Sequence, residues 1–557
     1  MEWAGFATYR LWLNSPKAIA IAFTPRDFRP VQAESGRAIL TGRFLLAGLV
    51  LETGQHGDPW DSISPSRRFA IKLHGFSWLP DLLAAGEAGE REALRLFVAW
   101  RAEFEQITPF AWGWETLERR VFNLACGAPR MLTHASEREA RLIAELLARQ
   151  ARRLVDMLGP ASRRAERLTV AAIGLAALAD PLGSRSLIRL LPRLCLTLEA
   201  ALLADGGLRS RSPEQGLELL YDLLTLEDLL SQRGMTPPAA VSRAIDRLTR
   251  SVQFLTLRDG RLASFHGGES VGSDRIQAAL QHEGAESPDS VPDRERHSDS
   301  GYVKLSGGGI EVVVDADAPP VNEWSIEACD QPLAMEVVCG KDRLITNCGW
   351  SPAAAAPLAL RLATAGSTAS LGGGTPGILL SGFLRRGLGA RLVRTTTEIR
   401  SALQDDEHGV LLELSHDGWV RTAHAIHQRR LFIDRLADEL RGEDCFRRIA
   451  QDRRQRPTLF SIRFHLATDV QVSLALDKRS VLLRGPSNKG WWFRNDAQEV
   501  SMEPSIHYEH GSARRAAQIV LRGWIPPGEP MARVRWKLTP VDASPEQARR
   551  SPAEATP

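Results

Sequence analysis

Residues 136–158 carry the hydrophobic pattern of an amphipathic helix. Ser136 and Glu139 have capping-box spacing at its start, and Gly159 and Pro160 follow its end. Apolar side chains recur every three or four positions, at Leu142, Ile143, Leu146, Leu147, Leu154 and Leu158. The pattern therefore predicts one helix over this range.

Helical patterns extend from about residue 90 to residue 260. Ser212, Pro213 and Gln215 predict the start of a second helix, which stops near Gly234. Residues 165–180 and 186–204 are almost wholly apolar, and the prolines at 237 and 238 introduce one more helix, ending near residue 257. Helices that are apolar on most faces need partners around them, which predicts paired helices in layers.

The period changes to two after a polar segment at 281–300, which we interpret as a linker or long surface loop. Apolar and polar residues alternate from Val470 to Leu476, and a turn at Asp477 and Lys478 leads into a second apolar run. Further strand-like runs are GIEVVVDAD, HGVLLELSHDG, RRLFIDRL, LFSIRFHLA and AQIVLRGW. Many strands without intervening helices predict a large antiparallel β-sandwich, and residues 541–557 are expected to form a disordered tail.

Composition narrows the function classes. The chain has 557 residues and a formal net charge of +3, which argues against a dedicated nucleic-acid-binding protein. No apolar run is long enough for a membrane-spanning helix. The six cysteines form no CxxC pair, so we interpret them as reduced and buried. The first residues lack the features of a secretory signal, which favours a cytoplasmic location.

A series of short strings follows in order along the chain. The N-terminal ones are GRFLLAG (42–48), DPWDSISPS (58–66), LHGFSWLPDL (73–82), DGGLRSRSPEQGLELLYDLL (205–224), PPAAVSRAIDR (237–247) and SGYVKL (300–305). The C-terminal ones are LITNCG (344–349), SHDGW (415–419), His427 with Arg429, RGED (441–444), RFHL (463–466), EPSIHY (503–508) and RRAAQIVLRG (514–523). In this order the strings resemble bacterial heparinase II/III-like proteins, and the resemblance covers roughly residues 40 to 525.

The resemblance implies an α + β multidomain protein, in which an incomplete α/α toroid precedes an antiparallel β-sandwich. We expect an N-terminal extension at 1–75, the toroid at 76–280, the linker at 281–300, the sandwich at 301–540 and the tail at 541–557. The implied partner is an acidic polysaccharide lying in a cleft between toroid and sandwich, with no cofactor. The family also implies the periplasm or cell envelope, as an alternative to the cytoplasm. The oligomeric state stays open.

Lyases of this type cleave a uronate glycoside by β-elimination. The uronate carboxylate must be neutralised, a base must remove the C5 proton, and an acid must protonate the leaving oxygen. Arg209 and Arg211 precede the helix that begins near Ser212, where a planar guanidinium and the helix start both favour a carboxylate. They are candidate substrate-binding residues, and Arg211→Ala is then expected to abolish turnover with the fold intact. Two solvated loop arginines are the alternative.

Three positions depart from the pattern that the resemblance implies. Leu208 and Cys329 stand where relatives carry histidine, and Gln215 stands where the well-characterised lyases carry a catalytic tyrosine. Tyr221 is the nearest phenol, about a turn and a half along the helix. Cys329 has no neighbouring cation in the sequence that would depress its pKa. The acid/base set of the characterised enzymes is therefore not intact.

Tyr302, His266 and His416 remain as catalytic candidates. Tyr302 begins the sandwich, His266 lies in a glycine-rich loop, and His416 is expected in a turn before a strand. Their alternatives are a buried structural tyrosine, a surface histidine and a ligand of a structural zinc that some relatives hold. Gln331 and Asn347 stand where the other zinc ligands would be expected, so we assign no metal site.

Aromatic side chains suit a saccharide groove because their faces stack on sugar C–H surfaces. Tyr221, Trp112 and Trp114 are candidate substrate-binding residues, with ordinary core packing as the alternative. Glu214, Glu218 and Asp222 lie on one stripe of the predicted helix. A hydrolase would need such carboxylates as a pair, but solvated charge on a helix surface explains them as well.

Two hypotheses follow. The first is a lyase acting on a uronate-containing polysaccharide. The second is a catalytically degenerate, carbohydrate-binding relative that serves synthesis or turnover of an envelope polysaccharide.

Overall fold

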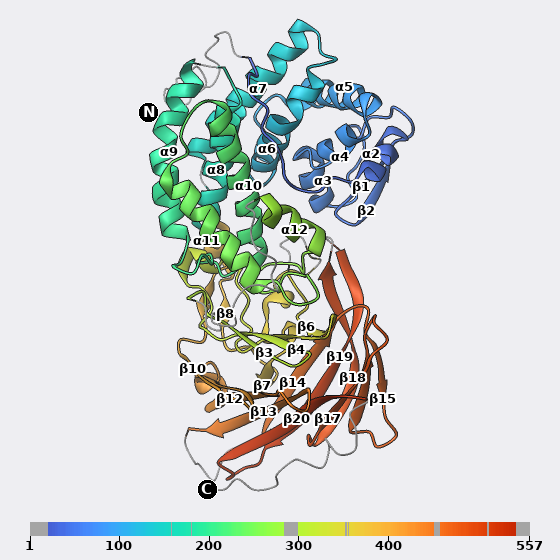
Figure 1. Ribbon diagram of the computed structural model, residues 1–557, viewed down its shortest axis with the longest axis vertical. Coiled ribbons are helices and arrows are strands. Elements are labelled where there is room, and N and C mark those ends of the chain that lie inside the picture. Colours follow the sequence, from blue (N-terminus) through green and yellow to red (C-terminus); the bar gives the residue numbers. More distant parts are fainter. Residues whose placement is uncertain are drawn as a thin grey trace. The chain divides into compact units, whose positions relative to one another are not determined.

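The computed structural model describes residues 20–157, 159–179, 181–282, 299–350, 354, 356–449, 457–509 and 512–541 (Figure 1). Most of the expected linker and the expected tail beyond residue 541 lie outside these ranges. The chain divides by contact into two compact units. The helical unit holds residues 1–202, 216–249 and 277–285, and the sandwich unit holds residues 203–215, 250–276 and 286–557.

The N-terminal part of the chain is almost entirely helical. A short hairpin, β1 (Arg43–Leu46) and β2 (Leu49–Glu52), follows the first helix. The helices are α2 (Ala33–Leu40), α3 (Arg67–His74), α4 (Leu79–Ala84), α5 (Glu87–Phe104), α6 (Trp114–Met131), α7 (Glu137–Asp156), α8 (Arg164–Ala176), α9 (Pro181–Ala201), α10 (Pro213–Gln232), α11 (Ala239–Leu255) and α12 (Ser273–His282). None of the helices in the described part of the chain combines the length and hydropathy that crossing a membrane requires.

Helix α8 lies at the centre of the helical unit, where it packs against α6, α7 and α9. Nearly all of its side chains are buried, as the apolar run at 165–180 predicted. Gly174 permits the close approach, because a Cβ there would lie 2.8 Å from Val121 of α6 and 2.9 Å from Ala151 of α7. The predicted layers of paired helices are thus present.

The predicted helix boundaries are confirmed to within a few residues. Ser136 and Glu139 form the capping box at the start of α7. Pro213 is the first residue of α10, and the Gln215 N–H approaches Ser212 Oγ at 3.5 Å. Local sequence signals were sufficient here because a helix start depends on neighbours within one turn.

The C-terminal part consists of antiparallel strands in two eight-stranded sheets. The first sheet has the order β18-β19-β14-β6-β5-β4-β3, with β7 beside β14, and the second has the order β10-β11-β12-β13-β20-β17-β16-β15. The strands of the first sheet are β3 (Tyr302–Gly307), β4 (Ile310–Asp315), β5 (Met335–Cys339), β6 (Asp342–Thr346), β7 (Ala369–Leu371), β14 (Thr458–Leu466), β18 (Glu499–Glu509) and β19 (Ser512–Ile525). Those of the second are β10 (Ile399–Asp405), β11 (Gly409–His416), β12 (Ala425–Asp434), β13 (Glu439–Arg448), β15 (Gln471–Leu474), β16 (Ser480–Arg484), β17 (Gly490–Asn495) and β20 (Met531–Pro540).

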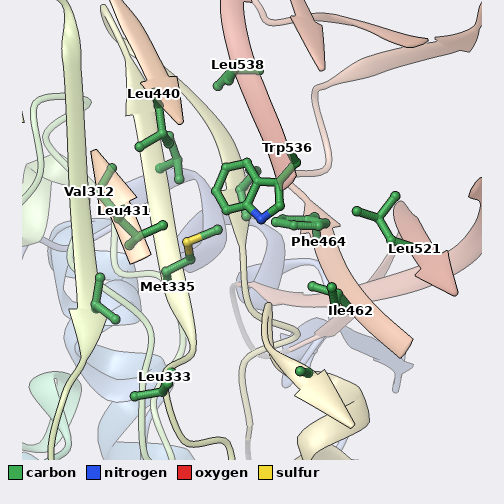
Figure 2. Close-up of a cluster of buried hydrophobic side chains, with 14 of the residues drawn as sticks. Val312, Leu333, Met335, Leu431, Leu440, Ile462, Phe464, Leu521, Trp536 and Leu538 are labelled. Carbon is green, nitrogen blue, oxygen red and sulfur yellow. The ribbon is translucent and has the colours of Figure 1, made fainter. Parts of the chain in front are cut away.

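The inward faces of both sheets form one hydrophobic core (Figure 2). Figure 2 shows Trp536 of the second sheet beside Phe464 of the first, and their ring centroids lie 4.9 Å apart, nearly edge to face. Burial of this interlocked set removes apolar surface from water and holds the sandwich together.

The alternating pattern at 470–476 forms β15, which pairs with β16 across the predicted turn. Asp477 Oδ1 accepts from the N–H groups of Arg479 and Ser480, which explains the turn. The expectation of strands without helices was wrong in detail. A small hairpin, β8 (Ile378–Leu379) and β9 (Leu392–Arg394), encloses α13 (Gly382–Leu388), and α14 (Val420–Ala423) joins β11 to β12.

Two segments from the helical half of the sequence group with the strands, namely 203–215 and 250–276. Arg343 of β6 holds the second of them. Its Nε and Nη2 donate to both carboxylate oxygens of Asp259 at 2.8 and 2.9 Å, and its Nη1 donates to Glu336 of β5 at 2.8 Å. The buried, bidentate pair fixes this loop against the first sheet.

Candidate functional site

Arg211 occupies the loop between α9 and α10, and its side chain is 5% exposed. Its φ is +58°, in the left-handed region that residues other than glycine seldom adopt. Each of the five guanidinium N–H groups has a protein acceptor. These acceptors are the carbonyl oxygens of Ser300, Gly301, Asp317 and Ala318, at 2.6–3.1 Å, and the carboxylate of Asp315. Arg211 therefore has no N–H left for a substrate carboxylate.

Asp315, the last residue of β4, joins Arg211 to His266. His266 Nε2 lies 2.9 Å from Asp315 Oδ2, while His266 Nδ1 accepts from the Cys329 N–H at 3.2 Å. Because a backbone N–H only donates, Nδ1 carries no proton, and the proton of the neutral ring lies on Nε2 facing the carboxylate. Burial lowers the pKa of His266, which keeps the ring neutral.

Tyr302 completes this group, which we call the Arg211 cluster (Arg211, Asp315, His266 and Tyr302). Its hydroxyl donates to the carbonyl oxygen of Arg211, and its ring centroid lies 5.0 Å from the guanidinium carbon. Burial raises the pKa of Tyr302 well above its ordinary value. A phenol that is buried, protonated and already donating is poorly placed to take a proton from a substrate.

The charge of Asp315 is stabilised inside the Arg211 cluster. Burial by itself raises the pKa of Asp315, but Arg211 and His266 outweigh it, and the pKa lies below its ordinary value. The cluster thus contains a buried ion pair in which every guanidinium N–H of Arg211 has an acceptor.

The three positions that depart from the resemblance are buried as well. Cys329 is 5% exposed, and burial raises the pKa of its thiol to about 11, so the thiol is protonated at neutral pH. Gln215 accepts from Ser210 Oγ at 2.8 Å and donates to Glu327. Leu208 is 5% exposed and adds an apolar side chain. None of them supplies the proton transfer that histidine or tyrosine would give there.

His416 belongs to a separate hydrogen-bond network, and it ends β11 rather than lying in a turn before a strand. Its Nδ1 accepts from the Gly418 N–H at 3.2 Å, so its Nε2 carries the proton and donates to His427 Nδ1 at 3.1 Å. His427 Nε2 then donates to Asp444 Oδ1 at 2.8 Å. Burial lowers the pKa of both histidines. The chain of bonds ends on Asp444, which Arg429 also contacts at 2.8 Å.

Gln331 and Asn347, which stand where the resemblance implies zinc ligands, are engaged with the protein backbone. Gln331 donates to the carbonyl oxygens of Leu360 and Leu362, and Asn347 accepts from the Ser367 N–H at 2.9 Å. Among the described residues, no three His, Cys, Asp or Glu side chains gather in a way that would hold a metal ion.

Comparisons with known proteins identify the family and the fold. The family model described as "Heparinase II/III-like, C-terminal" matches residues 290–537. The structure of heparinase III matches with a TM-score of 0.70 at 12% identity, over 98% of this chain and 90% of that one. Chondroitin AC lyase of Streptomyces coelicolor A3, solved with chondroitin sulphate, matches with a TM-score of 0.54 at 13% identity, over 93% of this chain and 80% of that one.

A curated relative is much closer in sequence. "FtsZ-localized protein C" of Caulobacter vibrioides is 47% identical over 550 residues, which cover 97% of this chain and 94% of that protein. The chain belongs to the heparinase II/III-like family. The expected fold, an incomplete α/α toroid followed by an antiparallel β-sandwich, is confirmed.

The aromatic residues predicted to bind sugar in this heparinase II/III-like protein lie in the helical unit. Trp112 is 1% exposed, and its Nε1 donates to the Phe104 carbonyl at 3.0 Å. Trp114 is half-buried at the start of α6. Tyr221 is fully buried, with the guanidinium carbon of Arg29 4.8 Å from its ring centroid. Packing accounts for Trp112 and Tyr221.

Of the acidic stripe of α10, Asp222 is buried, which corrects the expectation of solvated charge at that position, whereas Glu214 and Glu218 are half-buried. Asp222 accepts from Arg29 Nη2 at 2.7 Å and from Arg119 Nη2 at 2.8 Å. Glu218 accepts from the same Arg29 at 3.0 Å. Glu214, in the sandwich unit, accepts from the Glu269 N–H at 2.8 Å. Two arginines thus compensate Asp222 and Glu218.

The structure brings Arg211, His266 and Tyr302 together and places His416, Tyr221 and the tryptophans elsewhere. Arg209, the neighbour of Arg211, is exposed, and its role in substrate binding stays a prediction. Sequence reasoning missed Asp315, which holds the cluster together. A carboxylate at the end of the apolar run IEVVV was a signal, because a charged residue beside a buried strand needs a partner.

Proposed function

We propose that this protein is a non-cleaving member of the heparinase II/III-like family that localises with FtsZ and binds an acidic polysaccharide. The observation that carries the proposal is Arg211, whose five N–H groups all donate to protein oxygens. An arginine engaged in this way does not neutralise a uronate, and without that step the C5 proton is not acidic enough to remove.

The remaining candidate groups support the same proposal. Tyr302 donates to a backbone carbonyl, His266 faces a carboxylate, and Cys329 has a raised pKa because of burial. The 47% identity to "FtsZ-localized protein C" over nearly the whole of both chains supports a shared location. The lyase-like fold supports the class of ligand.

The test has two parts. The full chain is incubated with heparan sulfate, chondroitin sulfate, hyaluronate and polygalacturonate, while unsaturated uronate is followed by absorbance and binding by calorimetry. Binding of at least one glycan with no new unsaturated ends is the expected result, and failure to bind any of them contradicts the proposal. In cells, a fluorescent fusion is expected to coincide with FtsZ, and a diffuse signal contradicts that part.

A β-eliminating lyase is the second candidate function, and the exposed Arg209 favours it. Arg209 lies on the same loop as Arg211 and is exposed, so a uronate in solution can reach it. Unsaturated products that disappear in Arg209→Ala would establish this candidate and overturn non-cleavage.

A further inference from the structure

Three cations stand directly opposite one another on the solvent-facing side of the second sheet. Arg441 of β13 pairs with Lys537 of β20, and Lys537 pairs with Arg494 of β17. We call these three residues the cation row. Neighbouring strands lie about 4.8 Å apart, and like charges in directly opposite positions destabilise a sheet. The fold therefore gains nothing from this arrangement by itself.

Carboxylates compensate two members of the cation row. Glu439 accepts from Arg441 Nε and from Lys537 Nζ at 3.2 Å, and Asp434 accepts from Arg441 Nη2 at 3.3 Å. Within the described residues, the contacts of Arg494 are neutral ones. Its Nη1 donates to Thr539 Oγ1 at 3.2 Å, and its guanidinium carbon lies 5.5 Å from the ring centroid of Trp492. Arg494 thus presents a charge that no carboxylate in the described part of the chain neutralises.

The cation row lines a hollow of about 470 Å³. Arg430 and Arg535 add two further cations to its lining, whereas Glu439, Glu443 and Asp496 are its carboxylates. Two of the lining cations also pair with carboxylates outside the lining, Arg430 with Glu413 at 2.7 Å and Arg441 with Asp434 at 3.3 Å. Arg494 is thus the lining cation that has no ion pair with a described carboxylate. Ligand sites commonly measure roughly 300–1,000 Å³, so the hollow is large enough for several residues of a bound chain.

We propose that this hollow binds an acidic polypeptide segment. A carboxylate side chain of the segment would meet the guanidinium group of Arg494, whose planar fork matches a carboxylate, with Lys537 directly opposite it. The proposal goes beyond the binding of a polysaccharide, because it involves neither Arg209 nor the Arg211 cluster.

The surface fits a polypeptide better than a polysaccharide. Sugars stack on open aromatic faces, but Arg441 lies 5.6 Å from the ring centroid of Phe432 and Arg494 covers Trp492 in the same way. A carboxylate on a polypeptide side chain binds a guanidinium group directly and does not require an open aromatic face.

The test uses the full chain and fluorescent poly-L-glutamate, with binding followed by anisotropy. The triple variant Arg441→Gln, Lys537→Gln, Arg494→Gln is expected to bind at least about tenfold more weakly, because each loses a charge-assisted hydrogen bond. The single variant Arg494→Gln leaves Glu439 with both of its partners and is expected to weaken binding at least about threefold. Arg400→Gln, at an exposed arginine of β10 in the same sheet, is the matched control and is expected to bind as the unaltered protein does.

Three results would overturn the proposal. One is no binding of poly-L-glutamate at physiological salt. Another is equal binding by Arg494→Gln and Arg400→Gln. The third is tighter binding of heparin or polygalacturonate that Arg494→Gln weakens, which would make the hollow a glycan site. Failure of the polysaccharide proposal leaves the two poly-L-glutamate measurements unaffected, so the two proposals fail separately.

Discussion

The Arg211 cluster and the cation row place arginines in opposite situations. Arg211 is buried, and every N–H donates to a protein oxygen. Arg494 is exposed beside another cation, with neutral contacts. A buried arginine without spare donors stabilises the fold and offers little to a ligand, whereas an exposed and poorly compensated arginine costs stability and remains available. Arg211, which the resemblance implies as a substrate-binding residue, thus has a structural role. Arg494, which no family motif includes, is the arginine that a ligand can reach.

Arg211→Ala gives the largest expected effect. Asp315 would lose its guanidinium partner while staying buried, and four carbonyl oxygens would lose a donor. We expect the free energy of unfolding to fall by about 3–5 kcal/mol, measured by urea denaturation. This reverses the sequence-based expectation of an intact but inactive protein.

Arg209→Ala is the matched control for that measurement. Its side chain is exposed on the same loop, so a change within about 0.5 kcal/mol is expected. Equal unfolding free energies of the two variants would show that the Arg211 cluster does not stabilise the fold.

The second-largest expected effect is a loss of unfolding free energy at acidic pH, which comes from buried histidines. Burial lowers the pKa of His465 in the sandwich unit, and of His74 in the helical unit, to about 4. Their unfolded value is about 6.5, so this stability is complete above about pH 6.5 and is lost as the pH falls toward 4. Each histidine should remove about 2 kcal/mol from the unfolding free energy by about pH 5.

Urea denaturation at about pH 7 and about pH 5 measures this loss. His465→Asn should reduce it by one histidine's share, while His408→Asn, at an exposed histidine, should leave it unchanged. An equal loss in His465→Asn and in the unaltered protein would contradict the assignment of His465 as a buried neutral histidine. Comparing the two proteins cancels the contribution of Asp330, whose pKa burial raises to about 6 and which acts in the opposite direction.

The elements of the fold could be predicted from the sequence because their signals are local. The capping box of Ser136 and Glu139 spans one turn, and the alternation at 470–476 lies within one hairpin. The site could be predicted only in part. Arg211 and His266 were found as candidates, but their partner Asp315 lies 104 residues from Arg211 in the sequence. The sequence does not show that contact, so it does not distinguish an arginine whose N–H groups all donate to the protein from one whose N–H groups remain available.

The cation row lay beyond sequence reasoning for a different reason. Arg441, Arg494 and Lys537 belong to three strands, and only the register of β13, β20 and β17 makes them neighbours. A shift of one residue in either pairing would turn one of the charges toward the core. The sequence shows that these three side chains are cations, but it does not show that they are neighbours in the sheet.

Arg494→Gln gives the smallest expected effect on stability and the sharpest contrast with Arg211→Ala. Removing one of two directly opposed cations should leave the unfolding free energy unchanged or raise it by less than about 1 kcal/mol. Since the repulsion acts at the surface, any gain should be clearest at low salt and should shrink near 1 M salt, where the Debye length is about 3 Å. Urea denaturation at both salt concentrations, with Arg400→Gln as control, measures it. A loss of stability like that of Arg211→Ala would mean that Arg494 supports the sheet, and the contrast between the two arginines would disappear.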